Sequence, residues 1–155
     1  MKFFRNPYLA LVFRVVIGIV FIYAALPKIA DPFSFSVTIR NYQMIWPGIT
    51  NLIAIILPWL ELYTGLFLIT GFYIRESSHI LAVLTAGFII ALSSALIRGL
   101  DIGCGCFSAA DQTEKINLLK IAEDVVFLMM ILQIALVKNH VFTIGRFFSR
   151  TRPSR

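Results

Sequence analysis

The chain has 155 residues, of which 59% are apolar and 14% charged, with a mean hydropathy of +0.85. A soluble domain is typically about half apolar and about a quarter charged, so this composition excludes an ordinary soluble protein and indicates an integral membrane protein. The formal charge of +6 does not indicate nucleic-acid binding, because the basic residues gather at the two ends of the chain instead of forming one stripe. We therefore expect a lipid membrane, and no nucleic acid, around this protein.

Four long apolar runs alternate with short polar stretches along the chain. Each run is close to the roughly 20 residues that a helix needs to cross the hydrocarbon core of a bilayer. Short links favour antiparallel neighbours, so the sequence predicts an all-α, integral membrane four-helix bundle with up-and-down topology. We expect a single domain over residues 1–148 and a basic, disordered tail at 149–155. The predicted spans are about 8–29, 49–73, 80–97 and 116–137.

The three links between the predicted spans differ in character. The first, at residues 31–48, is rich in Phe, Tyr and Trp, which favour the membrane interface, so a short helix on the membrane surface is expected there. The second, IRESSH at 74–79, is predicted to be a short turn. The third, at 98–115, is polar and contains both cysteines of the chain.

The distribution of Lys and Arg predicts the orientation of the bundle. Nine of the fourteen lie in the N-terminal flank, the 74–79 turn and the C-terminal tail (three, one and five). Because short cytoplasmic segments are enriched in Lys and Arg, both termini are predicted to be cytoplasmic in a bacterial inner membrane. The 31–48 and 98–115 loops, and with them the cysteines, then face the periplasm.

Cys104 and Cys106 form a local pair within the segment GCGCF at 103–107. A disulfide between residues two apart closes a small, strained ring, and the glycines relieve part of that strain. Strained, exposed disulfides exchange readily and the periplasm is oxidising, so a redox-active pair is the leading interpretation. A static crosslink, half of a metal site and small residues packed beneath the loop are the alternatives. No metal is expected, because such a site needs more ligands and the two histidines, His79 and His140, map to the opposite side.

Glu61 lies in the middle of the second predicted span, close after Pro58 and Trp59. An ionised carboxylate near the bilayer centre costs at least about 2.5–3.5 kcal/mol, so it must face the bundle interior and find a partner or stay protonated. Arg14 and Lys28 of the first span are the candidate partners, and counting residues from the helix ends does not decide between them. Glu61 is either a proton acceptor that lines a polar pocket or half of an interhelical pair. Pro58 favours a pocket, because it frees the backbone carbonyl four residues earlier.

Other residues are candidates for supporting roles near the cysteines. Asp101 precedes them, and Asp124 lies near the start of the fourth span, where Lys120 at i−4 favours a local ion pair. A carboxylate near a thiol raises the pKa of that thiol and a cation lowers it, so such groups can tune the cysteines. Arg40 and Tyr42 lie in the first loop, on the same predicted side. They either cover the site, dock a partner, or anchor the loop at the membrane interface.

Several short motifs occur together in a specific order. They are ALPKIADP at 25–32, Asn41-Tyr42, LPWLE at 57–61 with Gly65 and Gly71, DIGCGCF at 101–107, and Asp124. With these motifs the chain resembles the DoxX-like superfamily, and more closely its methylamine-utilisation branch, MauE. The resemblance spans nearly all of the predicted membrane region and implies a four-helix membrane protein associated with redox chemistry.

The resemblance also implies a partner. The MauE branch is implicated in maturation of the methylamine dehydrogenase small subunit, which is dense in disulfides, alongside a thioredoxin-like periplasmic protein. Carried over to this chain, that role makes Cys104 and Cys106 the exchanging thiols.

From these features we expect a membrane thiol–disulfide oxidoreductase that exchanges electrons with a periplasmic thioredoxin-like protein through a mixed disulfide. A membrane quinone is the expected electron carrier for turnover, with Trp59 and Glu61 lining its pocket. Two alternatives stay open. The protein is a non-enzymatic assembly factor or membrane anchor for a redox partner, or it is a small-solute transporter that uses Glu61 as its coupling site.

Overall fold

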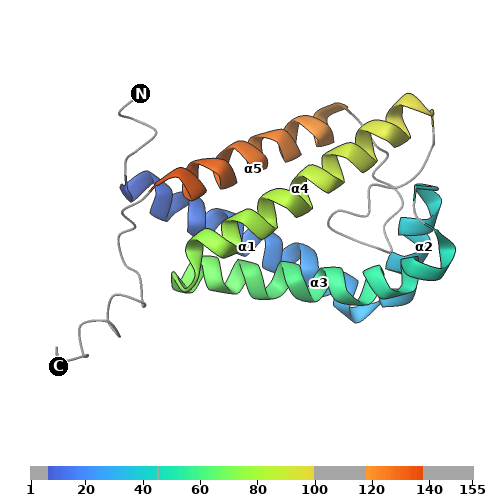
Figure 1. Cartoon of the computed structure of the whole chain (residues 1–155), viewed down its shortest axis with the longest axis horizontal. Coiled ribbons are helices and arrows are strands. Elements are labelled where there is room, and N and C mark those ends of the chain that lie inside the picture. The colour runs from blue at the N-terminus through green and yellow to red at the C-terminus, as the bar shows by residue number, and fades with distance from the viewer. Residues whose placement is uncertain (1–6, 45, 100–117, 138–155) are drawn as a thin grey trace.

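The computed structural model describes residues 7–44, 46–99 and 118–137. The described residues form five helices and no strands, which confirms the all-α prediction (Figure 1). The helices are α1 (Pro7–Ala30), α2 (Pro32–Asn41), α3 (Pro47–Thr70), α4 (Ile74–Ile97) and α5 (Leu118–Leu136). The predicted 149–155 tail lies outside the described residues.

The four longer helices run alternately in opposite directions, and α2 lies at the end where α1 and α4 finish and α3 and α5 begin (Figure 1). Helix α1 packs mainly on α3, and α4 packs mainly on α5. Among the described residues, α1, α3 and α4 are long and apolar enough to cross a membrane, by length and composition. The role of α5 as a fourth span and the cytoplasmic location of the termini stay predictions.

The short helix expected in the first loop is present as α2. Asp31 precedes it as the N-cap, and its carboxylate accepts a hydrogen bond from the backbone N–H of Ser34 at 3.0 Å and another from the Ser34 hydroxyl. Pro32 follows at the first helical position, where its missing N–H costs no hydrogen bond. The hydrogen bonds from Ser34, first from its hydroxyl and then from its backbone, lower the pKa of Asp31. The Asp31-Pro32 sequence therefore both closes α1 and starts α2.

The turn predicted at residues 74–79 is wrong, because these residues form the first part of α4. The chain reverses earlier, where Gly71 adopts the left-handed conformation (φ 77°) that ends α3, followed by Tyr73 at φ 47°. The polar side chains that suggested a loop are satisfied inside the helix instead. The Ser78 hydroxyl, for example, donates to the Ile74 carbonyl at 2.6 Å.

Helices α1 and α3 approach each other closely through two glycines. A Cβ on Gly18 would lie 2.8 Å from the Gly65 carbonyl oxygen and 2.4 Å from Cγ1 of Ile69, and a Cβ on Gly65 would lie 3.0 Å from the Gly18 carbonyl oxygen. Small residues of this kind let helix backbones pack tightly in membranes, where van der Waals contact drives association. The contact brings the polar residues of α1 within reach of α3.

We predict that Gly18→Ala destabilises the protein by about 1–3 kcal/mol, because the added methyl group must push against the backbone of α3. The matched control is Gly87→Ala in α4, where an added Cβ meets nothing within 4 Å. The measurement is the thermal unfolding midpoint of each purified variant in the same detergent. Equal midpoints for the two alanine variants would show that the α1–α3 contact is not close.

Candidate functional site

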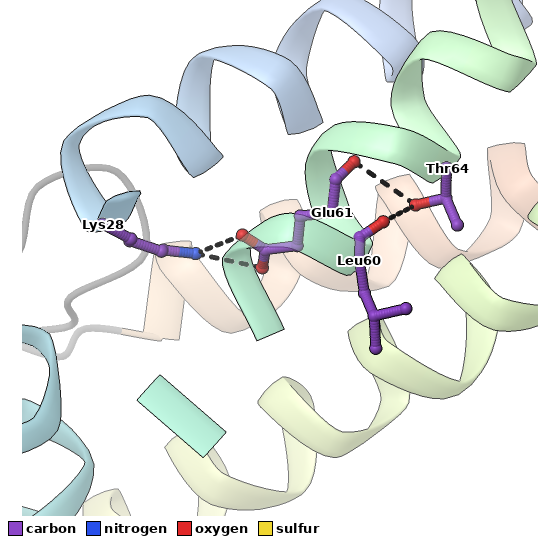
Figure 2. A network of polar contacts seen from close by, with 4 residues as sticks. All are labelled: Lys28, Leu60, Glu61 and Thr64. Carbon is purple, nitrogen blue, oxygen red and sulfur yellow. Dashed lines mark hydrogen bonds and ion pairs between the residues drawn. The ribbon is translucent and has the colours of Figure 1, made fainter. Parts of the chain in front are cut away.

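Two charged side chains meet inside the protein, between α1 and α3. Lys28 Nζ donates to both carboxylate oxygens of Glu61, at 3.0 and 2.9 Å, and each side chain is only 1% exposed (Figure 2). The partner of Glu61 is therefore Lys28. Figure 2 also shows Thr64, one turn further along α3, whose hydroxyl bonds back to the carbonyls of Leu60 and Glu61.

Arg14, the other candidate partner, binds the far end of α3. Its Nε donates to the Leu68 carbonyl at 3.0 Å, and its Nη2 lies 3.5 Å from the Ile69 carbonyl oxygen. These carbonyls belong to the last turn of α3, where no helical N–H is available to them, and a cation there also complements the helix dipole. The two buried basic residues of α1 thus hold α3 at two separate places.

A small cavity of about 40 Å³ lies beside the Lys28–Glu61 pair. Its polar lining comes from three helices besides α1, through Glu61, Thr85 of α4 and Asp124 of α5. The Asp124 Oδ2 atom is buried and accepts no hydrogen bond within the described part of the chain. A cavity of this size that contains several polar groups has room for a water molecule, which would satisfy such an oxygen. The arrangement gathers one ammonium and two carboxylates around a single small space.

Two aromatic rings also lie close to the Lys28 ammonium. Nζ lies 5.3 Å from the ring centroid of Phe35 in α2 and 5.1 Å from that of Phe88 in α4. At these distances the negative faces of the rings attract the cation. Residues from α1, α2, α3 and α4 therefore converge on one nitrogen atom.

A second, larger cavity of about 310 Å³ lies between α2, α3 and α4. Phe88 lines this cavity as well as the small one, so its ring separates a charged space from an apolar one. The only hydroxyl groups in the described lining are those of Thr38 and Tyr42. Burial, together with the nearby Asp124 carboxylate, raises the pKa of Tyr42 to about 12, so its phenol stays protonated at neutral pH.

The structure brings together some of the residues that the sequence singled out. Glu61, Lys28 and Asp124 line the small cavity, and Tyr42 lines the large one. Pro58 is fully buried inside α3.

Trp59 and Arg40 lie elsewhere. Trp59 is 43% exposed on the outer face of α3 and stacks on Tyr63 at a centroid distance of 5.9 Å, so it does not join Glu61 at the cavity. Arg40 is exposed at the end of α2. Cys104, Cys106 and Asp101 lie outside the described residues.

Sequence reasoning missed Phe35, Phe88 and Thr85. The two phenylalanines stand in aromatic-rich or apolar stretches, where nothing marks one ring as the neighbour of an ammonium. Thr85 carried a weak signal, because it is a polar residue in the middle of an apolar span, but its hydroxyl also has a local role, donating to the Leu81 carbonyl at 2.8 Å.

The ends of α4 and α5 that flank the cysteine segment lie at the same end of the molecule as α2 (Figure 1). Arg98, just after α4, donates to the Tyr42 carbonyl and to the Gln43 side-chain oxygen, both at 3.0 Å. Ile121, near the start of α5, packs against the cluster that contains Tyr42 and Ala95. The chain therefore leaves α4 and enters α5 beside the end of α2.

We predict that Lys28→Met and Glu61→Met each lower stability by about 3–5 kcal/mol, because each leaves its partner as an unpaired buried charge. The double variant Lys28→Met/Glu61→Met should lose less than either single variant, since no charge then remains unpaired. Chemical unfolding of the four proteins in detergent gives the coupling energy as a double-mutant cycle.

The control for this cycle is the partly exposed pair Lys120–Glu123, whose Nζ–Oε2 distance is 3.3 Å. Its methionine cycle should give a coupling of only about 0–1 kcal/mol. A Lys28–Glu61 coupling no larger than this one would show that the buried pair does not hold α1 against α3.

Comparison with known proteins identifies the family. Residues 6–137 match the family model described as methylamine utilisation protein MauE. No curated protein and no solved structure matches the chain. The wider resemblance to the DoxX-like superfamily stays a prediction. The match runs from the start of α1 to the end of α5 and includes every residue of the site, and the chain therefore belongs to the MauE family of membrane proteins.

Proposed function

We propose that this protein is a membrane thiol–disulfide redox protein whose Cys104–Cys106 pair exchanges electrons with a periplasmic thioredoxin-like protein. The family description names methylamine utilisation, and within it we propose the maturation of a disulfide-rich protein as the physiological task. The observation that carries the proposal is where the cysteine segment attaches. The helices that flank it, α4 and α5, meet it at the end of the molecule where α2 lies, and Asp124 in the second turn of α5 lines a cavity together with Lys28 and Glu61.

The exchange needs only the two cysteines and a partner disulfide. One cysteine, as thiolate, attacks a sulfur of the partner disulfide, which forms a mixed disulfide and releases the partner's other thiolate. The second cysteine then attacks the mixed disulfide. The Cys104–Cys106 bond forms, and the partner leaves with two thiols, having gained two electrons and two protons. The reverse sequence oxidises the partner, and the same residues serve both directions.

The charged cluster supports this chemistry through its position. Asp124 lies in the second turn of the helix that follows the cysteine segment, and its buried Oδ2 accepts no described hydrogen bond. A carboxylate with a spare oxygen offers an acceptor for a proton that a thiol releases.

Turnover also needs a carrier that takes up or supplies two electrons. We propose a membrane quinone, because it dissolves in the bilayer and reacts in a step of two electrons and two protons, as a dithiol does. The apolar cavity beside Phe88 supports a lipid-soluble carrier in preference to a soluble one.

A transporter that couples through Glu61 has less support. Both carboxylate oxygens of Glu61 already accept hydrogen bonds from Lys28 in a closed, buried pair. A coupling carboxylate must exchange its proton or ion during each cycle, and breaking this pair would leave two buried charges unpaired.

We predict that Cys104→Ser or Cys106→Ser traps a mixed disulfide between the remaining cysteine and the thioredoxin-like partner. The trapped species forms because the second, resolving thiol is gone. Acid quenching, alkylation and mass spectrometry of membranes from cells that express each variant give the partner and the linked residues. The chain has only two cysteines, so any crosslink in a single variant must come from the one that remains.

The double variant Cys104→Ser/Cys106→Ser is the control and should form no crosslink. If this double variant still supports maturation of the disulfide-rich substrate, the protein is an assembly factor or anchor. A pair whose thiol state stays the same under reducing and oxidising growth would also exclude the redox function.

A further inference from the structure

The residues that line the 310 Å³ cavity between α2, α3 and α4 include buried ones, which we call its closed end, and exposed ones, which we call its rim. At the closed end, Phe35 and Tyr42 are buried. At the rim, Val83 is 72% exposed and Met44 is 47% exposed. Val83 belongs to α4, one of the helices that is long and apolar enough to cross a membrane, so the rim lies on a surface suited to contact lipid.

The cavity exists because α3 and α4 are only lightly packed against each other. Helix α3 packs chiefly on α1 and α4 chiefly on α5, while α2 fills one end of the space between them. Gly87 of α4 widens this space, since it has no side chain and a Cβ added to it would meet nothing within 4 Å. A gap of this size inside a protein is normally filled by side chains or occupied by a ligand.

We propose that this cavity is the binding site of an isoprenoid quinone. Among the described residues, the lining is apolar apart from two hydroxyl groups, and that of Thr38 already donates to the Ser34 carbonyl at 3.0 Å. Such a lining suits an uncharged, lipid-soluble molecule and excludes a charged solute. The volume lies near the lower limit of about 300 Å³ for small-molecule pockets, so it fits a ring and the first part of a tail. The rest of the tail would pass the rim into the bilayer.

The closed end distinguishes a quinone from a phospholipid acyl chain. Phe35 and Phe88 line it with aromatic rings, and behind both rings lies the Lys28 ammonium, at 5.3 and 5.1 Å. A flat ring gains stacking contacts with such walls, whereas an acyl chain gains only ordinary apolar contact.

This site differs from the one that the sequence suggested. Trp59 stacks on Tyr63 at the outer face of α3, and Glu61 lies on the other side of Phe88, in the small cavity. The quinone site rests on the proposed function, because the electrons that reduce the quinone come from the cysteine pair. The Cys104–Cys106 dithiol would give up two electrons and two protons to become a disulfide, and the quinone would take up both to become a quinol.

The test uses the full chain in lipid nanodiscs with a photoreactive azido-quinone that carries a short isoprenoid tail. We expect label on α3 between Ile53 and Leu57 and on α4 between Val83 and Ala91. Gly87→Phe places a ring in the cavity and should weaken quinone binding about tenfold, or about 1.4 kcal/mol. Ile90→Phe, at an exposed position of the same helix outside the cavity lining, is the matched control and should bind as the unchanged protein does.

A second variant covers the case in which Gly87→Phe fails to fold. Val83→Trp stands at the exposed rim, where a larger side chain disturbs no core contact, and it should obstruct the entry of the ring. Unchanged binding in the folded cavity variants would overturn the proposal. So would labelling that excess phospholipid displaces as well as excess quinone does, since the occupant would then be an acyl chain.

Different experimental results would contradict the proposed function and the proposed quinone site. The Cys104→Ser/Cys106→Ser protein should still bind the quinone, because none of the described residues that line the cavity is a cysteine. Quinone binding without any thiol exchange would support the quinone site and contradict the proposed redox function. Thiol exchange in a protein that takes up no quinone label would overturn the quinone site alone.

Discussion

The buried ion pair between Lys28 and Glu61 is the constraint on which the rest of this structure depends. A charge that has left water is tolerated only when its partner is held in place, so the pair permits one relative position of α1 and α3. The Gly18–Gly65 contact allows the close approach, and Arg14 binds the last carbonyls of α3 at the opposite end. Because Lys28 also contacts rings of α2 and α4, the same nitrogen atom positions three further helices around it.

The sequence analysis named Lys28 as one candidate partner of Glu61 but could not choose it over Arg14. Counting residues from the helix ends ignores the direction in which side chains point. The contacts of Gly18 with Gly65 and of Arg14 with Leu68 set the antiparallel register, which places Lys28 about six residues, or about 9 Å, from the level of Glu61. Helical side chains lean toward the N-terminus of their own helix, and in antiparallel helices those directions are opposite. Lys28 and Glu61 therefore lean toward each other and meet at 2.9 Å.

Apolar runs predicted most of the helices, and the aromatic-rich stretch at 31–48 predicted a short helix, because these signals are local. The polar segment 74–79 was misassigned since its side chains bond to their own helix, which hydropathy does not detect. The large cavity gave no local signal at all. The cavity arises because α3 packs mainly on α1 and α4 packs mainly on α5, which leaves α3 and α4 lightly packed against each other. Its residues Phe35 and Phe88 are ordinary apolar residues in the sequence. The cysteine pair was conspicuous in the sequence, and its geometry lies outside the described residues.

Helix α2, expected only to rest on the membrane surface, connects the parts of the site. It contributes Phe35 both to the apolar cavity and to the surroundings of Lys28, and Tyr42, at its end, receives a hydrogen bond from Arg98. Arg98 directly follows α4 and lies six positions before Cys104 in the sequence. Its hydrogen bonds join the end of α4 to the end of α2, and α2 in turn contributes Phe35 to the cavity and to the surroundings of Lys28. In the proposed redox function, α2 is therefore the element that connects the helix leading to the cysteines with the apolar cavity.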